Sequence, residues 1–287
     1  MTELTLPLLR YRFPLPSHDG DGSKDERGRV LVIGGHRTVP GGALLAATGA
    51  LRAGAGKLQV ATVDSIAVPI GVAIPESLSA GFGEANDGGF PADAADRIAE
   101  RAAKVDAVLL GPGMMDGEGT DALVRSLLEV DKPLVLDAAA ISALSEHEER
   151  ARARGGLAIL PHSGELAGLR GCEEDEIKTD PAGIGLDTAR RWGAVTLVKG
   201  SDSHVASPEG ELLHYAGGGI GLATSGSGDV LAGIVAGLLA RGLEPLGAVL
   251  WGVWLHGEAG RRLAHRIGRV GFLARELLDE VPGLMEA

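Results

Sequence analysis

The chain has 287 residues and a formal net charge of −12, and 45% of its residues are apolar. A chain of this length and apolar content can form a sizeable hydrophobic core without stabilising disulfides or metal ions. Its negative net charge and its lack of a lysine- and arginine-rich segment disfavour nucleic acid as a partner. Cys172 is the single cysteine, which excludes an internal disulfide, and no His/Cys cluster indicates a structural zinc site.

No segment of the sequence predicts export or a membrane span. The first residues lack a basic stretch followed by a long apolar run, and no apolar run reaches the ~18 residues of a transmembrane helix. We therefore expect a cytoplasmic protein without a membrane partner.

Residues 14–27 are rich in proline, glycine and charge, so we expect residues 1–27 to form an N-terminal loop or extension and residues 28–287 to form one domain. Short aliphatic runs then alternate with alanine-rich helical stretches. Strands are predicted at 30–33, 57–62, 106–110, 134–136, 157–160 and 195–198, and helices at 43–53, 120–130 and 182–192. This alternation predicts an α/β domain with a largely parallel sheet.

The last third of the chain changes pattern. Residues 204–206 and 211–214 flank the turn-forming cluster Ser207-Pro208-Glu209-Gly210, which predicts a hairpin at one edge of the sheet. Two long helices, at about 229–240 and 245–264, are expected to close the domain.

A glycine-rich loop, residues 217–228, leads directly into the helix that is predicted to begin at Asp229. Small residues let the backbone approach a ligand, and a helix N-terminus favours phosphate. Asp229 is either the N-cap of that helix or a base that takes a proton from a hydroxyl attacking phosphorus. We favour the base, because a carboxylate beside a phosphate cradle is otherwise unfavourable.

Other candidate residues follow the predicted strands, at the edge where open α/β folds bind ligands. They are Gly111-Pro112-Gly113, Asp137, His162 and Lys199. Each has a structural alternative: an ordinary turn, a helix start capped by Ser163, or a lysine that reaches into solvent. The three tryptophans and His256 are expected to be structural. Neither a dinucleotide-binding G-x-G-x-x-G motif nor a P-loop is present.

From Gly28 onward the chain resembles the ADP/ATP-dependent NAD(P)H-hydrate dehydratases, a branch of the ribokinase-like superfamily. The resemblance rests on an ordered set of motifs: Val32-Ile33-Gly34-Gly35, Ala50-Leu51-Arg52-Ala53-Gly54-Ala55-Gly56, Gly111-Pro112-Gly113, Leu136-Asp137-Ala138, Pro161-His162-Ser163-Gly164-Glu165, Val198-Lys199-Gly200 and Gly226-Ser227-Gly228-Asp229. It implies a three-layer α/β/α domain. It also implies a carbon–oxygen lyase that repairs the S-form of hydrated NADH or NADPH, by phosphorylating the ring hydroxyl and releasing phosphate.

The resemblance also implies roles for particular residues. Asp229 matches the catalytic base. The phosphate-binding anion hole is Gly226, Ser227 and Gly228, and the remaining nucleotide-binding residues are Lys199, Gly200, Ser201, Asp202 and Ser203. The hydrated cofactor is expected to contact Gly42, Gly113, His162 and Asp229.

ADP is the expected donor and ATP the alternative, since the chain resembles stand-alone bacterial-type relatives without a fused epimerase domain. Mg²⁺ is expected, with Asp137 and Glu165 as its nearest carboxylates. The chain departs from the family pattern at Ala139 and Gly219, where an acidic residue and an asparagine are usual, and at Ser225 and Ser227. A homo-oligomer is implied, with the tetramer as the state of relatives.

Two alternatives to this interpretation stay open at the level of sequence. The chain could be a kinase of the same superfamily, acting on a hydroxymethylpyrimidine- or hydroxyethylthiazole-type alcohol, with the same base and anion hole but a stable phosphorylated product. It could instead be a non-catalytic sensor of adenine nucleotides that has lost turnover through the changes at Ala139 and Gly219.

Overall fold

The computed structural model describes residues 1–17 and 24–286, and its centre is one ten-stranded sheet with the order β1-β10-β9-β8-β7-β6-β5-β2-β3-β4. β9 pairs antiparallel with both β8 and β10, and all other neighbours are parallel. The strands are β1 (Thr2–Glu3), β2 (Arg29–Ile33), β3 (Lys57–Thr62), β4 (Ser77–Gly81), β5 (Ala107–Leu110), β6 (Leu134–Leu136), β7 (Leu157–Ile159), β8 (Ala194–Val198), β9 (Ser203–Ala206) and β10 (Leu212–Tyr215). The predicted mostly parallel sheet is confirmed.

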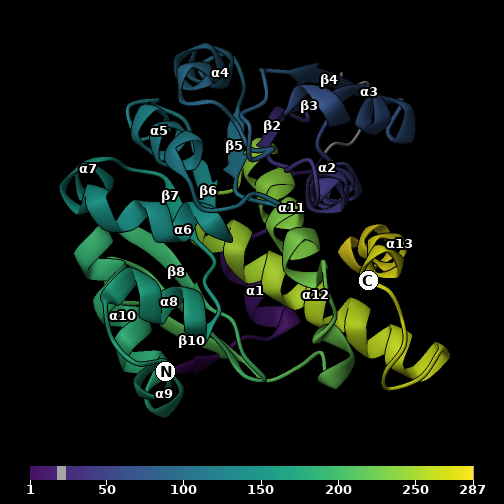
Figure 1. Ribbon diagram of the computed structural model, residues 1–287. Helices are drawn as coiled ribbons and strands as arrows, with labels where there is room; N and C mark the ends of the chain where they lie inside the picture. Colours follow the sequence, from purple (N-terminus) through teal and green to yellow (C-terminus); the bar gives the residue numbers. More distant parts are fainter. Residues whose placement is uncertain (18–23, 287) are drawn as a thin grey trace.

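Helices cover both faces of the sheet and complete three layers (Figure 1). One face carries α2 (Pro40–Arg52), α3 (Asp64–Ala73), α11 (Ser227–Ala240) and α12 (Pro245–Arg266), with α1 (Leu6–Arg12) and α13 (Ala274–Met285) packed outside them. The other carries α4 (Ala95–Ala102), α5 (Glu118–Leu127), α6 (Ala139–Ala143), α7 (Glu148–Ala153), α8 (Ser163–Arg170), α9 (Glu174–Thr179) and α10 (Pro181–Trp192). Short 3₁₀ turns lie at Ala92–Ala94, Leu144–His147 and Ile220–Leu222.

The central strands are apolar throughout because both of their faces are covered. Every residue of β5, β6, β7 and β8 is buried. A parallel strand between two helical layers has no solvated face, so its sequence reads as a continuous aliphatic run. This is why these strands could be predicted.

The structure differs from the expectations at both ends of the chain. The first 27 residues are not only loop, because β1 and α1 lie within them; residues 18–23 of that segment lie outside the described residues. β1 pairs in parallel with β10, so the predicted hairpin of β9 and β10 forms but does not lie at the edge. A third helix, α13, follows the two predicted long ones. A two-residue strand and a seven-residue helix are too short to give a periodic signal.

Close packing of α11 on α2 positions the glycine-rich loop. A Cβ at Gly49 of α2 would lie 2.9 Å from the Val230 carbonyl oxygen, and Gly233 of α11 has a similarly close approach to the Ala46 backbone. Glycine allows the two helix backbones to approach more closely than larger residues would. The first turns of α11 are therefore held against α2. None of the helices in the described ranges is long and apolar enough to cross a bilayer.

Candidate active site

The carboxyl ends of β2, β5, β6, β7 and β8 meet at one edge of the sheet and face the N-terminus of α11. The Gly35 amide donates to the Pro112 carbonyl at 2.8 Å, which ties the loop after β5 to the end of β2. His162 and Lys199 form a parallel bridge beyond β7 and β8. Parallel topology thus brings together residues that are far apart in sequence.

Three charged side chains form a cluster at this edge. Lys199 Nζ donates to Asp137 Oδ1 at 2.8 Å and lies 3.6 Å from Glu165 Oε2. Asp137 is only 2% exposed. Burial lowers the pKa of Lys199, but the charges of Asp137 and Glu165 more than offset this, so that its pKa lies above the ordinary value. Lys199 is therefore a fixed cation at neutral pH.

Asp229 lies in the first turn of α11, but it is not the helix cap. α11 begins at Ser227, and its N-cap is Gly226, whose φ of 87° is in the left-handed region that glycine favours. Asp229 is thus the third helical residue, and its cap alternative is wrong. The sequence placed the helix start two residues late because serine and glycine are weak helix formers.

The surroundings of Asp229 raise the pKa of its carboxyl group. Burial raises its pKa to about 6, with a further contribution from the charge of Asp137, while Lys199 and a hydrogen bond from the Gly113 amide oppose the rise. A carboxylate with this pKa is largely ionised at neutral pH yet is a stronger base than an exposed aspartate. The side chain is therefore suited to accept a proton from a hydroxyl.

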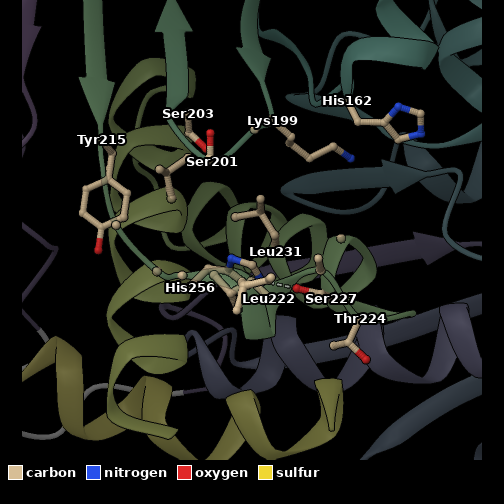
Figure 2. A pocket seen from close by; sticks show the side chains of 18 residues that line it. His162, Lys199, Ser201, Ser203, Tyr215, Leu222, Thr224, Ser227, Leu231 and His256 are labelled. Carbon is tan, nitrogen blue, oxygen red and sulfur yellow. Dashed lines mark hydrogen bonds between the residues drawn. The ribbon is translucent and has the colours of Figure 1, made fainter. Parts of the chain in front are cut away.

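A cavity of about 750 Å³ adjoins the cluster. Its volume suits a nucleotide-sized ligand. Figure 2 shows His162 and Lys199 on one side of it and Ser227, Thr224 and His256 across from them. The predicted nucleotide residues on its wall are Lys199, Gly200, Ser201, Ser203, Ser227 and Gly228. Asp202 is exposed and is not part of the wall.

His162 organises a helix as well as facing the cavity. It is the N-cap of α8: its Nδ1 accepts from the amides of Gly164 at 3.0 Å and Glu165 at 3.2 Å. Glu165 Oε2 accepts from the His162 amide at 2.8 Å, which completes a capping box. The structural alternative placed the cap at Ser163, but the Ser163 hydroxyl donates to Glu174 and His162 is the cap. The ring is exposed, and its Nε2 lies 3.4 Å from Glu165 Oε1.

Gly42 and Gly113 lie on the other side of Asp229, outside the large cavity. A Cβ at Gly42 would lie 2.5 Å from the Gly113 nitrogen, and Gly113 itself has a φ of +66°. These contacts hold the Gly113 amide where it reaches Asp229. The structure thus brings Gly42, Gly113 and Asp229 together, with His162 across the strand edge.

Sequence reasoning missed several residues of the cavity wall, among them His256 and Tyr215. His256 of α12 is 9% exposed, and its Nε2 lies 2.8 Å from Ser227 Oγ; burial lowers the pKa of this histidine to about 4, so it is neutral. Tyr215 ends β10 and donates from its hydroxyl to Glu258 at 3.0 Å. No local signal marks either one, because His256 reaches the cavity through the packing of α12 and Tyr215 through its place at the end of β10.

The predicted metal residues, Asp137 and Glu165, are neighbours, but Lys199 lies between them. Within residues 1–17 and 24–286, no group of three or more His, Cys, Asp or Glu residues is arranged to hold a metal ion. Mg²⁺ commonly uses one or two carboxylates and takes its other ligands from water and substrate phosphates. The pair fits that pattern, provided that a nucleotide supplies the remaining oxygens.

The mostly parallel sheet with helices on both faces, and the glycine-capped helix at its carboxyl edge, define a ribokinase-like protein. A structure described as a ribokinase-like superfamily protein from Enterococcus faecalis superposes with a TM-score of 0.85 over 100% of this chain and 95% of that one, at 24% identity, which supports the fold. An ADP/ATP-dependent NAD(P)H-hydrate dehydratase from Bacillus subtilis, co-crystallised with ATP and Mg²⁺, gives a TM-score of 0.83 at 28% identity over 99% of this chain and 98% of that one.

Sequence comparison identifies the family within the ribokinase-like proteins. A family model described as NAD(P)H-hydrate dehydratase matches residues 30–283. An ADP-dependent (S)-NAD(P)H-hydrate dehydratase of Xanthomonas campestris is 47% identical over 99% of this chain and 96% of its own length. A bifunctional NAD(P)H-hydrate repair enzyme of Moorella thermoacetica is 38% identical over 94% of this chain, which spans 52% of that protein. The chain belongs to the NAD(P)H-hydrate dehydratase family, as its motifs indicated.

Proposed function

We propose that this chain dehydrates the S-form of hydrated NADH or NADPH, with ADP as the phosphoryl donor. The observation that carries the proposal is Asp229, a buried carboxylate with a pKa of about 6 beside a helix N-terminus that suits phosphate. The Xanthomonas relative, which is described as ADP-dependent, supports the donor.

In the proposed reaction, the large cavity binds ADP and the charged side chains beside it act on the transferred phosphoryl group. ADP lies along Lys199 to Ser203, with its terminal phosphate at the glycine-capped start of α11, formed by Gly226, Ser227 and Gly228. Asp229 takes the proton of the ring hydroxyl as its oxygen attacks that phosphorus, and the bond to the bridging oxygen breaks to release AMP. Phosphate then leaves the ring carbon with the C–O bonding electrons, and loss of a proton from the neighbouring carbon restores the dihydronicotinamide.

We assign Lys199 and the loop backbone to charge stabilisation. Lys199 is held by Asp137 and lies beside Gly228, where a Cβ would be 3.6 Å from its Nζ. A fixed ammonium and preorganised amides stabilise negative charge that develops on the transferring phosphoryl group. Asp137 and Glu165 would hold Mg²⁺ through its water ligands, and the ion would neutralise charge on the donor phosphates.

The remaining features of the proposal concern the whole protein. Residues 28–287 form one catalytic domain that works in the cytoplasm, in keeping with a single cysteine, Cys172. Exposed apolar residues on α3, where Val68 is 75% and Val72 77% exposed, support a homo-oligomer, and we propose that it is a tetramer. Light scattering of the purified protein measures this assembly directly.

The test is absorbance at 340 nm after mixing the protein with hydrated NADH, Mg²⁺ and either ADP or ATP. Absorbance is expected to rise with ADP and to stay flat for Asp229→Asn. Asp121→Asn is the matched control, because Asp121 lies in the first turn of α5, exposed and remote from the cluster. A flat trace for the wild type with both nucleotides would overturn the proposal.

A further inference from the structure

A second cavity, of about 660 Å³, lies between α2 and α13. Its walls include Leu44 and Thr48 of α2, Leu278 of α13, and Thr224 and Ser225 of the loop before α11. Figure 1 shows α13, in yellow, beside α2 and the start of α11. Thr224 also lines the first cavity, so this loop is a wall that the two cavities share.

This second cavity begins next to the backbone that holds Asp229. Its wall includes Gly41, the neighbour of Gly42, which contacts the Gly113 backbone. The Gly113 amide in turn hydrogen-bonds Asp229. A ligand whose reacting group lies at Asp229 could therefore extend from Gly42 into the space between α2 and α13.

Gly226 marks the boundary between the two cavities. A Cβ there would overlap Leu45 Cδ1 and lie 3.4 Å from Ala274 Cβ, and both of these residues line the second cavity. On its other side, Gly226 caps the helix whose next residues, Ser227 and Gly228, line the first cavity. The glycine-capped end of α11 thus lies between the two cavities.

The second cavity has the chemistry of a nucleotide subsite. Leucines from α2 and α13 form an apolar floor, against which a base can lie. Two carboxylates also line the wall: Asp279, and Glu276, whose Oε2 accepts from the Leu273 amide at 2.6 Å. Arg275 is exposed at its rim and forms no hydrogen bond or ion pair within the described part of the chain. Arg52, by contrast, is paired with Asp279 at 2.8 Å. A free guanidinium above an apolar floor suits a phosphate attached to a nucleoside.

We propose that the cavity between α2 and α13 binds the adenylate half of the hydrated dinucleotide, with Arg275 on one of its phosphates. The proposal rests on the proposed function, because a dinucleotide acceptor carries a second nucleotide that the donor cavity cannot hold while ADP occupies it. The hydrated ring then lies at Asp229, and the phosphoryl group passes across Gly226.

Two variants test the assignment against the wild type, with hydrated NADH and hydrated NADPH as substrates. Arg275→Glu places a negative charge at the rim, and Thr48→Phe fills the cavity from α2. Each is expected to raise KM for the hydrate about tenfold or more, while kcat and KM for ADP stay unchanged. Arg10→Glu is the matched control, since Arg10 is exposed on α1 and lines neither cavity.

Comparing KM for hydrated NADH and hydrated NADPH shows which phosphate group of the substrate Arg275 contacts. A rise in KM for both hydrates assigns Arg275 to the adenylate phosphate of the pyrophosphate, and a rise for hydrated NADPH alone assigns it to the ribose phosphate. Hydrated reduced nicotinamide mononucleotide lacks the adenylate half, so its KM is expected to be the same in both variants as in the wild type. An unchanged KM for both dinucleotides in both variants would overturn the proposal, as would an equal loss with the truncated substrate.

Binding of NADH and NADPH, followed by their fluorescence in the presence of AMP, is a second readout that needs no turnover. Weaker binding in Arg275→Glu and Thr48→Phe, but not in Arg10→Glu, supports the cavity. If the wild type fails to restore absorbance but binds in this Arg275-dependent way, the proposed function falls and the cavity assignment stands. Binding that is unchanged in both variants overturns the cavity assignment even if turnover is normal.

Discussion

Lys199 holds the Asp137 carboxylate by a hydrogen bond of 2.8 Å, and Asp137 is 2% exposed. The Lys199 ammonium forms an ion pair with this buried carboxylate. Its own position at the end of β8 is set by the sheet, since its amide donates to the Pro161 carbonyl at 2.8 Å. The cation is thus fixed by the fold before any ligand binds.

Lys199→Met should therefore destabilise the protein as well as weaken nucleotide binding. Removing one partner of a buried ion pair leaves an uncompensated charge, and this costs about 3–5 kcal/mol. Urea denaturation at pH 7 measures the loss. Lys199→Met combined with Asp137→Asn is expected to recover much of it, because the buried charge is removed too. A double variant no more stable than Lys199→Met would contradict this account.

The pH dependence of kcat/KM should report Asp229. Because burial raises its pKa to about 6, the base is protonated in acid, and kcat/KM should fall about tenfold per pH unit below that value. Above about pH 7 the profile should be level. The dissociation constant for AMP, measured over the same range by calorimetry, should lack this acid limb, since binding does not require the base.

The buried Asp229 carboxylate, which we propose is needed for activity, should lower the stability of the folded chain at neutral pH. Its folded pKa of about 6 exceeds the ordinary 3.8, so the folded chain holds a proton more tightly, and stability is lost as pH rises from about 4 to 6. Asp229→Asn should thus be more stable than the wild type at pH 7, by up to about 3 kcal/mol, and equal to it near pH 4. Thermal unfolding at both pH values checks this. A variant less stable at pH 7 would show that the amide loses contacts that the carboxylate makes.

Much of this site could be predicted because parallel topology turns sequence order into spatial proximity. Asp137, His162 and Lys199 each follow a buried aliphatic run, and the ends of such runs share one edge of the sheet. His256 could not be assigned in this way. It meets Ser227 only because α12 packs on α11, a contact between residues 29 positions apart that no local pattern records.

The second cavity was hidden for the same reason. It exists because α13 returns to α2 after the two long helices, and neither helix carries a motif for the contact. Part of the N-terminal segment was missed for a different reason: β1 gains its hydrogen bonds from β10, so its structure depends on a distant partner rather than on its own residues.

His256 should make the protein acid-sensitive. Its pKa of about 4 in the folded chain lies below the ordinary 6.5, so the unfolded chain takes up a proton first, and stability is lost as pH falls from about 6.5 to 4. The loss is about 3 kcal/mol. His256→Gln keeps a hydrogen-bonding group but cannot titrate. The stability of wild type relative to this variant should fall by that amount between pH 7 and pH 4, and a constant difference would contradict the neutral buried imidazole.

Backbone strain beside Asp137 leads to the last prediction. Ala138 has φ 49° and ψ −132°, and it is the single non-glycine residue with positive φ in the described ranges. Such a conformation costs about 1–3 kcal/mol and persists only where the surroundings enforce it. Here it turns the chain from β6 into α6 while Asp137 keeps its contact with Lys199.

Ala138→Gly should therefore stabilise the protein by about 1 kcal/mol, since relief of strain exceeds the added entropy of the unfolded chain. Ala139→Gly, at the first position of α6, is the matched control and should not stabilise the protein, because no strain is relieved there and glycine adds entropy to the unfolded chain. Urea denaturation of both variants measures the change in the free energy of unfolding and its sign in each. If both variants lose stability, Ala138 is not strained, and the position of Asp137 owes nothing to its neighbour's backbone.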